Sequence, residues 1–285
     1  MSHTVTRSGA GVELELGGRL LGLHCSSNRL HYQPGVYRLN FEGLGELPAE
    51  EAGDALVALF AEARAALAAH RPTLLRVTLE AGSPLLPRLQ ALGFLLVRGV
   101  HVLALDVADL LRAPGAAADG ALRMVPLAAA RSLVSEDELM DALEQAYGRA
   151  ARLDPATPEN FSGEERRSLF LGAEDLDEQL SVCALEGESL VGICPVHTGD
   201  DERERELGAV GVIAGWGERH TEVSLAMIRA VAEVVEVRGV ERLVAEVDAD
   251  APFSVHTYAA LPGRVTESLV SLMYVPKWDA AGAEG

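Results

Sequence analysis

The chain contains the same order of elements twice, once in each half of its 285 residues. In each copy the spacing of apolar residues predicts a long amphipathic helix, a buried strand, a turn with proline, a short helix and a long strand. The copies cover residues 49–107 and 221–275, and LLRVTLEAGSPLLPRLQALGF corresponds to RLVAEVDADAPFSVHTYAALPG with about one residue of slippage. Because right-handed crossovers join parallel strands, we expect the strands flanking each long helix to pair in parallel.

The segments outside this repeat add further strands and helices. Alternating apolar and polar residues predict strands over residues 11–22 and 35–41, each with one buried face. In the second half the pattern predicts a strand over residues 122–126, then a helix whose first turn carries Glu136 and its acidic neighbours, which suits the helix dipole. Three more strands form a predicted meander over residues 180–185, 189–197 and 206–213.

Residues 113–120, APGAAADG, separate the two copies. They are small and without periodicity, which is typical of a flexible linker. We therefore expect an N-terminal domain over residues 1–112 and a C-terminal domain over residues 121–285, and two domains of ordinary size also suit a chain of this length.

The charge of the chain excludes one class of partner. Its net charge is −19, from 43 acidic and 24 basic residues, and it has no basic cluster larger than Arg166-Arg167. Such a chain repels a polyphosphate backbone, so we expect no nucleic-acid partner. An acidic surface instead favours a cationic substrate.

Apolar runs and cysteines limit the location and the chemistry. No apolar run reaches the ~18 residues of a membrane-spanning helix, and the first residues lack a secretion signal, so a cytoplasmic location without membrane attachment is expected. The three cysteines lack CxxC spacing and are predicted to be small buried hydrophobes. His197 and His256 have no partner at metal-ligand spacing, so no metal site is expected. The cysteines are Cys25, Cys183 and Cys194.

Residues 121–276 follow the order strand, two helices, three-strand meander, long helix, strand, short helix, strand. In this order they resemble the Gcn5-related N-acetyltransferase (GNAT) superfamily, and the two halves together resemble its tandem members. In the first half the resemblance covers residues 35–107. It implies an α/β (α+β) fold of two tandem GNAT-like domains, each a mixed, mostly antiparallel sheet flanked by helices.

Three local features carry this resemblance. Thr221 follows the place where the family's acetyl-CoA loop enters its long helix, residues 244–250 form a strand that ends in a polar turn, and Tyr258 lies in the short helix before the family's Leu-Gly-Phe break. The family loop reads Arg/Gln-x-x-Gly-x-Gly/Ala, and its backbone N–H groups point at pyrophosphate from a helix N-terminus. Here Arg219 is in place and Glu222 replaces the first glycine.

Glu222 changes what this loop offers to a phosphate. A carboxylate in the first turn suits the helix but opposes a pyrophosphate, and its β-carbon crowds the approach. An alternative register uses Gly215-Trp216-Gly217, which restores glycines but moves them away from the helix start. The resemblance also implies that the cofactor's pantetheine arm pairs with the strand over residues 210–213. The cofactor-binding residues expected for acetyl-CoA are Val212, Ile213, Arg219, His220, Thr221, Glu222, Val223 and Ser224.

Two residues are the catalytic candidates that the resemblance implies. Tyr258 would be the general acid that protonates the departing CoA thiolate, and its other interpretation is a half-buried tyrosine that anchors a short helix. Glu206, or Glu204, would be the base that deprotonates the amine, and its other interpretation is a solvated acidic residue. In the first half, Gly43-Leu44-Gly45 has no basic residue nearby, so we expect a structural or substrate-shaping N-terminal domain.

The resemblance implies an N-acyltransferase that moves an acetyl or acyl group from acyl-CoA to an amine. The expected partner is a small-molecule amine or a peptide amine, and a homodimer is among the expected assemblies. The alternative is a GNAT-derived protein that has lost catalysis and serves binding or regulation, because a fold alone does not supply activity.

Overall fold

The computed structural model describes residues 3–8, 11–16, 19–27, 36–113, 122–151, 167, 171–199, 201–213 and 219–278. The chain divides into two compact units. Unit 1 comprises residues 1–98, 156–158 and 269–285, and unit 2 comprises residues 99–155 and 159–268. None of the helices in the described ranges is long and apolar enough to cross a membrane.

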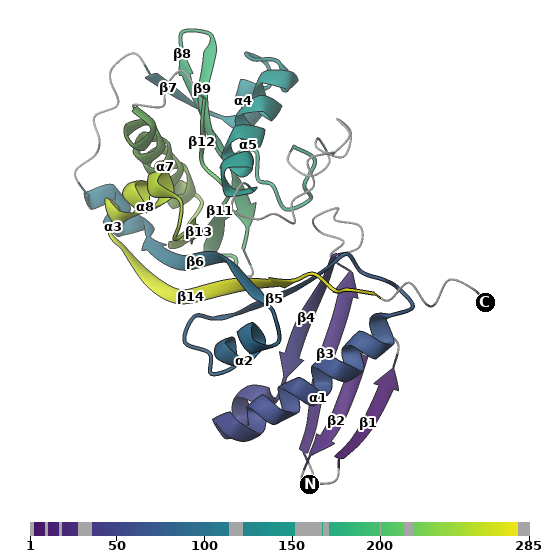
Figure 1. The fold of residues 1–285 in the computed structure, drawn as a ribbon. Helices are drawn as coiled ribbons and strands as arrows, with labels where there is room; N and C mark the ends of the chain where they lie inside the picture. The colour runs from purple at the N-terminus through teal and green to yellow at the C-terminus, as the bar shows by residue number, and fades with distance from the viewer. Residues whose placement is uncertain are drawn as a thin grey trace. The chain divides into compact units, whose positions relative to one another are not determined.

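Unit 1 is built on a sheet with the strand order β1-β2-β3-β4-β5-β14 (Figure 1). Its neighbours are antiparallel except for β4 and β5, which are parallel. Helix α1 packs on β2 and β3, and α2 packs on α1. The elements are β1 (His3–Ser8), β2 (Gly11–Leu16), β3 (Arg19–Ser27), β4 (Val36–Glu42), α1 (Ala49–Leu67), β5 (Leu74–Glu80), α2 (Leu86–Ala91) and part of β14 (Gly263–Tyr274).

The prediction of a single strand over residues 11–22 is wrong. The chain forms an antiparallel hairpin there, in which β2 and β3 pair from Gly11↔His24 to Leu16↔Arg19. The sequence holds Gly17-Gly18 between the two strands. A Gly-Gly pair is typical of a turn. The turn was not predicted because apolar and polar residues alternate on both sides of this pair, as they do in one continuous strand.

The core of unit 1 lies between α1 and the sheet. Leu56 and Leu59 are fully buried, as the periodicity of this helix predicts. At one end, the rings of Phe60, Phe94 and Tyr274 lie 5.1 to 5.3 Å apart, centroid to centroid. Phe60 comes from α1 and Tyr274 from β14, so the last strand of the chain contributes to the core of unit 1.

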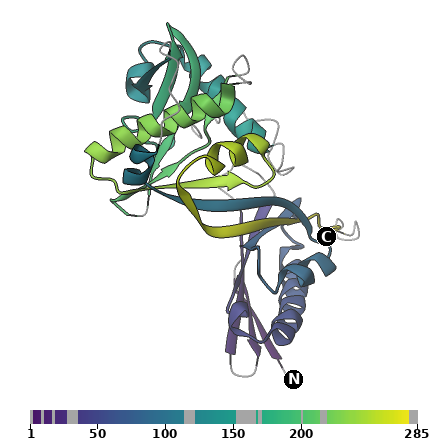
Figure 2. The same ribbon diagram turned by 90° about the vertical axis from the view of Figure 1, so that its left-hand side faces the viewer.

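Unit 2 holds two sheets, with the strand orders β14-β6-β13-β11-β10 and β12-β9-β8-β7 (Figure 1). Helix α7 packs on one face of the four-stranded sheet and α5 on strands of the same sheet (Figure 2). Its elements are β6 (Leu95–Asp106), α3 (Val107–Arg112), β7 (Leu122–Pro126), α4 (Leu127–Ala130), α5 (Glu136–Ala151), β8 (Val182–Glu186), β9 (Ser189–Cys194), β10 (Val196–Thr198), β11 (Glu204–Leu207), β12 (Gly211–Val212), α7 (His220–Val237), β13 (Arg242–Asp248) and α8 (Pro252–Ala259).

Local signals set the ends of two helices in unit 2. Before α5, Ser135 Oγ accepts a hydrogen bond from the Glu138 N–H at 3.2 Å, and the Glu138 carboxylate accepts one from the Ser135 N–H at 2.9 Å. This reciprocal arrangement is a capping box, and its hydrogen bonds lower the pKa of Glu138. After α7, Gly239 has a φ of 77°, the left-handed conformation that ends a helix.

The two copies predicted from the sequence have the same pattern of strand pairing. β4 and β5 precede and follow α1 and pair in parallel from Val36↔Leu74 onward. β11 precedes β12 and α7, and it pairs in parallel with β13, which follows α7, from Glu204↔Arg242 onward. Both findings confirm the expected parallel pairing. Each copy then continues through a short helix to a 12-residue strand, β6 in the first copy and β14 in the second.

The last strand of each copy completes the sheet of the other copy. Within unit 2, β6 pairs antiparallel with β13, from Asp106↔Arg242 to Val100↔Asp248. Within unit 1, residues 269–274 of β14 pair antiparallel with β5. The sequence did not predict this exchange. The linker expected over residues 113–120, between the two copies, stays a prediction. Most of that segment lies outside the described residues.

Candidate functional site

The single strand expected over residues 206–213 is two short strands with different partners. β11 pairs in parallel with β13, over residues 204–207 and 242–245. β12 pairs instead with β9, antiparallel, and includes the pair Val212↔Gly192. The expectation of one strand is therefore wrong, because the backbone leaves one partner for another between β11 and β12.

β12 does not continue the pairing of β11 with β13. β13 continues beyond its pairing with β11 and reaches Asp248 beside β6, whereas β12 stays beside β9. Within the described ranges no strand pairing joins β12 to β13. Val212 is fully buried in the cluster beneath α7, while Ile213 packs against the cluster beneath α5 and donates its N–H to the Val191 carbonyl at 2.9 Å.

Gly192 allows β9, β12 and α7 to approach closely at this point. A Cβ there would lie 2.6 Å from the Gly211 carbonyl oxygen and 2.9 Å from Met227 Cε. We expect Gly192→Ala to lower the free energy of unfolding by about 1–3 kcal/mol, because the backbone of β12 would have to shift. Urea denaturation would measure this, with Gly82→Ala as the control because a Cβ at residue 82 meets nothing within 4 Å. Equal stability of the two variants would contradict the close approach.

The first turn of α7 carries an internal ion pair. Arg219 donates to the Glu222 carboxylate twice, from Nε to Oε2 at 2.9 Å and from Nη2 to Oε1 at 2.5 Å. The two side chains are 34% and 35% exposed. Arg219, which the resemblance implies is a cofactor-binding residue, is therefore paired with the residue that stands in place of the loop glycine.

The other predicted loop residues face the interior to different degrees. His220 and Ser224 are buried, and His220 Nδ1 lies 3.4 Å from Ser224 Oγ. Val223 is fully buried in the cluster beneath α7, and Thr221 is half-buried. His220 and Ser224 therefore contribute to the packing of the helix start. The alternative register, Gly215-Trp216-Gly217, lies outside the described residues.

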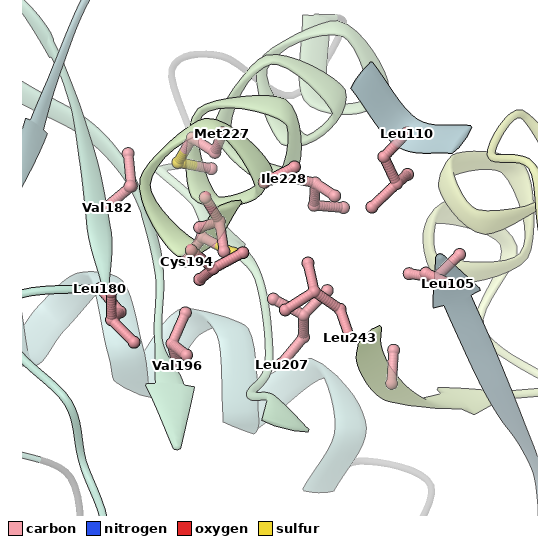
Figure 3. Close-up of a cluster of buried hydrophobic side chains, with 14 of the residues drawn as sticks. Leu105, Leu110, Leu180, Val182, Cys194, Val196, Leu207, Met227, Ile228 and Leu243 are labelled. Carbon is pink, nitrogen blue, oxygen red and sulfur yellow. The ribbon is translucent and has the colours of Figure 1, made fainter. Parts of the chain in front are cut away.

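Tyr258 lies in α8 and is 8% exposed. It belongs to the same buried cluster as Val212, Val223 and Cys194, and Figure 3 shows Cys194 together with Met227 of α7 in that cluster. Burial raises the pKa of Tyr258 well above its ordinary value, and the Cys194 thiol adds to the rise. Burial also raises the pKa of Cys194 to about 12. Both groups are therefore protonated at neutral pH.

Glu206 lies away from Tyr258. It is exposed on β11 and opposite His197 in the register, and His197 Nδ1 lies 3.3 Å from Asp175 Oδ2. Its neighbour Leu207 is buried in the cluster that contains Tyr258. Because successive side chains of a strand point to opposite faces, Glu206 lies on the other face of β11. Glu204, the alternative base, forms an ion pair with Arg242 at 3.4 Å.

The structure thus brings together one part of the predicted site. One buried cluster contains Val212, Val223 and Tyr258. Val223 itself lies in the first turns of α7. The sequence missed the proximity of Cys194 to Tyr258, for which it holds no local signal. It also missed the pairing of Arg219 with Glu222, although the i, i+3 spacing on a helix is a signal for such a pair.

No metal site is formed by the residues that the structure describes, since they contain no group of three or more His, Cys, Asp or Glu side chains suited to hold an ion. The three cysteines are free and buried, as predicted.

Known proteins match this chain in structure, whereas neither comparison of its sequence gave a match. No protein-family model and no curated protein matches the sequence. Among solved structures, a GCN5-related N-acetyltransferase from Sphaerobacter thermophilus is 20% identical, with a TM-score of 0.64 over 94% of this chain and 82% of that one. A tandem GNAT protein from the clavulanic acid biosynthesis pathway is 17% identical, with a TM-score of 0.59 over 94% of this chain and 83% of that one.

A third structure gives the same result over almost the whole length. A GCN5-related N-acetyltransferase from Kribbella flavida is 18% identical, with a TM-score of 0.56 over 97% of this chain and 91% of that one. At these identities the similarity concerns the fold. The two copies, their parallel strand pairs and these structures together show that the chain has the GNAT fold, with two copies in tandem.

Proposed function

We propose that the protein is an N-acyltransferase that moves an acetyl or acyl group from an acyl thioester, such as acetyl-CoA, to an amine. The observation that carries this proposal is that β11 pairs with β13 whereas β12 pairs with β9, and that Tyr258 lies in the same buried cluster as Val212 of β12. An extended donor arm would lie along β12, because a strand that leaves its neighbour offers a place for another extended chain.

The residues at the start of α7 fit one part of CoA poorly. The positive end of a helix attracts a diphosphate, but Glu222 already occupies this turn and uses two donors of Arg219. A second negative group there would meet repulsion from the Glu222 carboxylate. The fit of the donor therefore rests on the pantetheine arm and the acyl group, and no step of the reaction is assigned to the diphosphate.

The chemistry of the transfer is the attack of an amine nitrogen on the thioester carbonyl carbon. The N–C bond forms, the C–S bond breaks, and the sulfur leaves with the electron pair of that bond. Tyr258 would donate its phenolic hydrogen to this sulfur as negative charge develops on it. Because burial raises the pKa of Tyr258, the phenol keeps its proton over the whole neutral range.

The proton released by the amine would go to the face of β11 that carries Glu206. Glu206 is exposed and stands opposite His197, which is paired with Asp175. Because Glu206 lies on the face of β11 away from Tyr258, it would accept this proton through intervening water and not by direct contact with the amine. The net charge of −19 supports a cationic amine, either a small molecule or a peptide amine, as the acceptor.

Acyl transfer tests this function directly. The protein would be incubated with acetyl-CoA and, in parallel, with S-acetylpantetheine, together with polyamines and basic peptides, and amide products would be identified by mass spectrometry. We expect an amide with primary amines and none with the same compounds after N,N-dimethylation, because a tertiary amine has no proton to release. Absence of product with both donors and every primary amine would contradict an acyltransferase.

One observation favours the second candidate, a binding or regulatory protein without catalysis. The Arg219–Glu222 pair leaves the start of α7 electrostatically satisfied without a ligand. A protein of this kind would bind acyl thioesters weakly or not at all, and would give no amide in the same assay. The two candidates therefore separate on product formation, and loss of product with retained folding would select the second.

A further inference from the structure

The carboxylate of Glu222 already accepts hydrogen bonds from Arg219, the basic side chain beside the start of α7. The guanidinium plane of arginine presents parallel N–H donors that match a carboxylate and a phosphate in the same two-point manner. Arg219 makes this contact with Glu222 through Nε and Nη2, at 2.9 and 2.5 Å. The internal carboxylate thus takes the two donors of Arg219 that could otherwise bind a phosphate.

The position of Glu222 stabilises its pair with Arg219 in the absence of a ligand. Glu222 lies in the first turn of α7, where a negative charge is stabilised by the helix dipole. It is tethered three residues from Arg219, so the pair forms without the loss of translational freedom that an external ligand suffers on binding. A diphosphate would have to displace Glu222 or add two negative charges beside it.

We propose that this pair excludes the diphosphate from the start of α7, so that the site selects acyl thioesters by their pantetheine and acyl parts alone. The donor class is then acyl-pantetheine thioesters in general, and the nucleotide part of CoA contributes little to binding. This inference rests on the proposed function for the identity of the donor. The exclusion itself concerns only the first turn of α7.

Calorimetric binding of CoA and of pantetheine tests the exclusion without any need for turnover. For the natural sequence we expect the two dissociation constants to agree within about threefold, because a phosphate that makes no charge-assisted hydrogen bond adds little affinity. Glu222→Gly is expected to strengthen CoA binding about 10- to 100-fold, the usual range for one or two hydrogen bonds to a charged group, and to leave pantetheine binding unchanged.

Four further variants complete the test. Glu222→Gln removes the carboxylate that pairs with Arg219 without placing a glycine in the helix, so it should give part of the same gain if Glu222→Gly folds poorly. Arg219→Ala should leave CoA binding unchanged alone but remove the gain when combined with Glu222→Gly. Glu236→Gly, at an exposed position near the other end of α7, is the matched control and should change neither constant.

The outcomes separate this inference from the proposed function. The exclusion is overturned if CoA binds the natural sequence more than about tenfold tighter than pantetheine, or if neither variant at residue 222 gains affinity for CoA, since either result leaves the pair without effect on a phosphate. Gain of CoA affinity in the variants, with no amide formed by any of them, would support the exclusion and count against the acyltransferase alone.

Discussion

Tyr258→Phe is expected to lower kcat for acyl transfer about 10²- to 10⁴-fold, the usual contribution of a positioned proton donor. The substitution removes the phenolic hydroxyl, the group proposed to donate to the leaving sulfur. It keeps the ring, which is buried in the cluster with Val212 and Cys194. The dissociation constant of the donor should therefore stay the same, and a progress curve of thiol release at saturating donor measures the loss.

The control for this prediction is Tyr274, a tyrosine of the other unit. Tyr274 packs edge-on against Phe60 in unit 1, and Tyr274→Phe keeps that ring contact. It should leave kcat unchanged, and thermal unfolding should show that both variants fold like the natural sequence. A rate for Tyr258→Phe equal to that of the control would remove Tyr258 from the mechanism.

The pH dependence of kcat provides a second check on Tyr258. An unperturbed tyrosine loses its proton near pH ~10. Burial raises the pKa of Tyr258 well above that value, so the phenol stays protonated throughout the range in which the protein would be assayed. We therefore expect no loss of kcat from this group between pH 8 and pH ~10, since only the deprotonated form would fail to donate. A fall in that range that Tyr258→Phe abolishes would contradict the raised pKa.

The repeat is the part of the fold that the sequence predicts best, for a physical reason. The helices α1 and α7 each bury one continuous face, so the 3.6-residue period of their apolar residues is strong, and Gly239 marks the end of α7. The strands β5 and β13 are short apolar runs bounded by turn residues. These signals are local, and the parallel pairing of the strands around each helix follows from chain geometry alone.

The exchange of β6 and β14 left no such signal. Each strand carries a pattern that would suit its own copy as well as the other, because a strand's alternation records which face is buried and not which neighbour it pairs with. The hairpin of β2 and β3 was missed for a related reason, since alternation continues on both sides of Gly17-Gly18.

The sequence predicted the helices that carry the candidate residues but not the contacts of those residues. Arg219 and Glu222 lie beside and within the first turn of α7, and Tyr258 lies in α8, while their roles stay predictions. Which atoms they face depends on three-dimensional packing. The bidentate pair of Arg219 with Glu222, and the placement of Glu206 on the face of β11 away from Tyr258, follow from side-chain geometry that spacing alone does not give.

Leu272→Ala is expected to lower the free energy of unfolding of unit 1 by about 2–5 kcal/mol, the usual range for a buried leucine. Leu272 is fully buried in the core that α1 covers, yet it lies near the end of the chain, on β14. The loss should appear in unit 1, because residues 269–274 pair with β5 there. The core of unit 1 would thus depend on a strand made after all of unit 2.

The fluorescence of Trp278 reports this loss selectively. Trp278 belongs to unit 1, where its Nε1 donates to the Pro72 carbonyl at 2.8 Å, and the chain has two tryptophans. In a Trp216→Phe background, urea denaturation followed at Trp278 should give a lower midpoint for Leu272→Ala. Leu95→Ala, at a position that is 67% exposed, should change the free energy by less than about 0.5 kcal/mol. Equal midpoints for the two variants would show that unit 1 folds without help from β14, whereas a selective loss would make the exchanged strand a condition for the stability of the N-terminal copy.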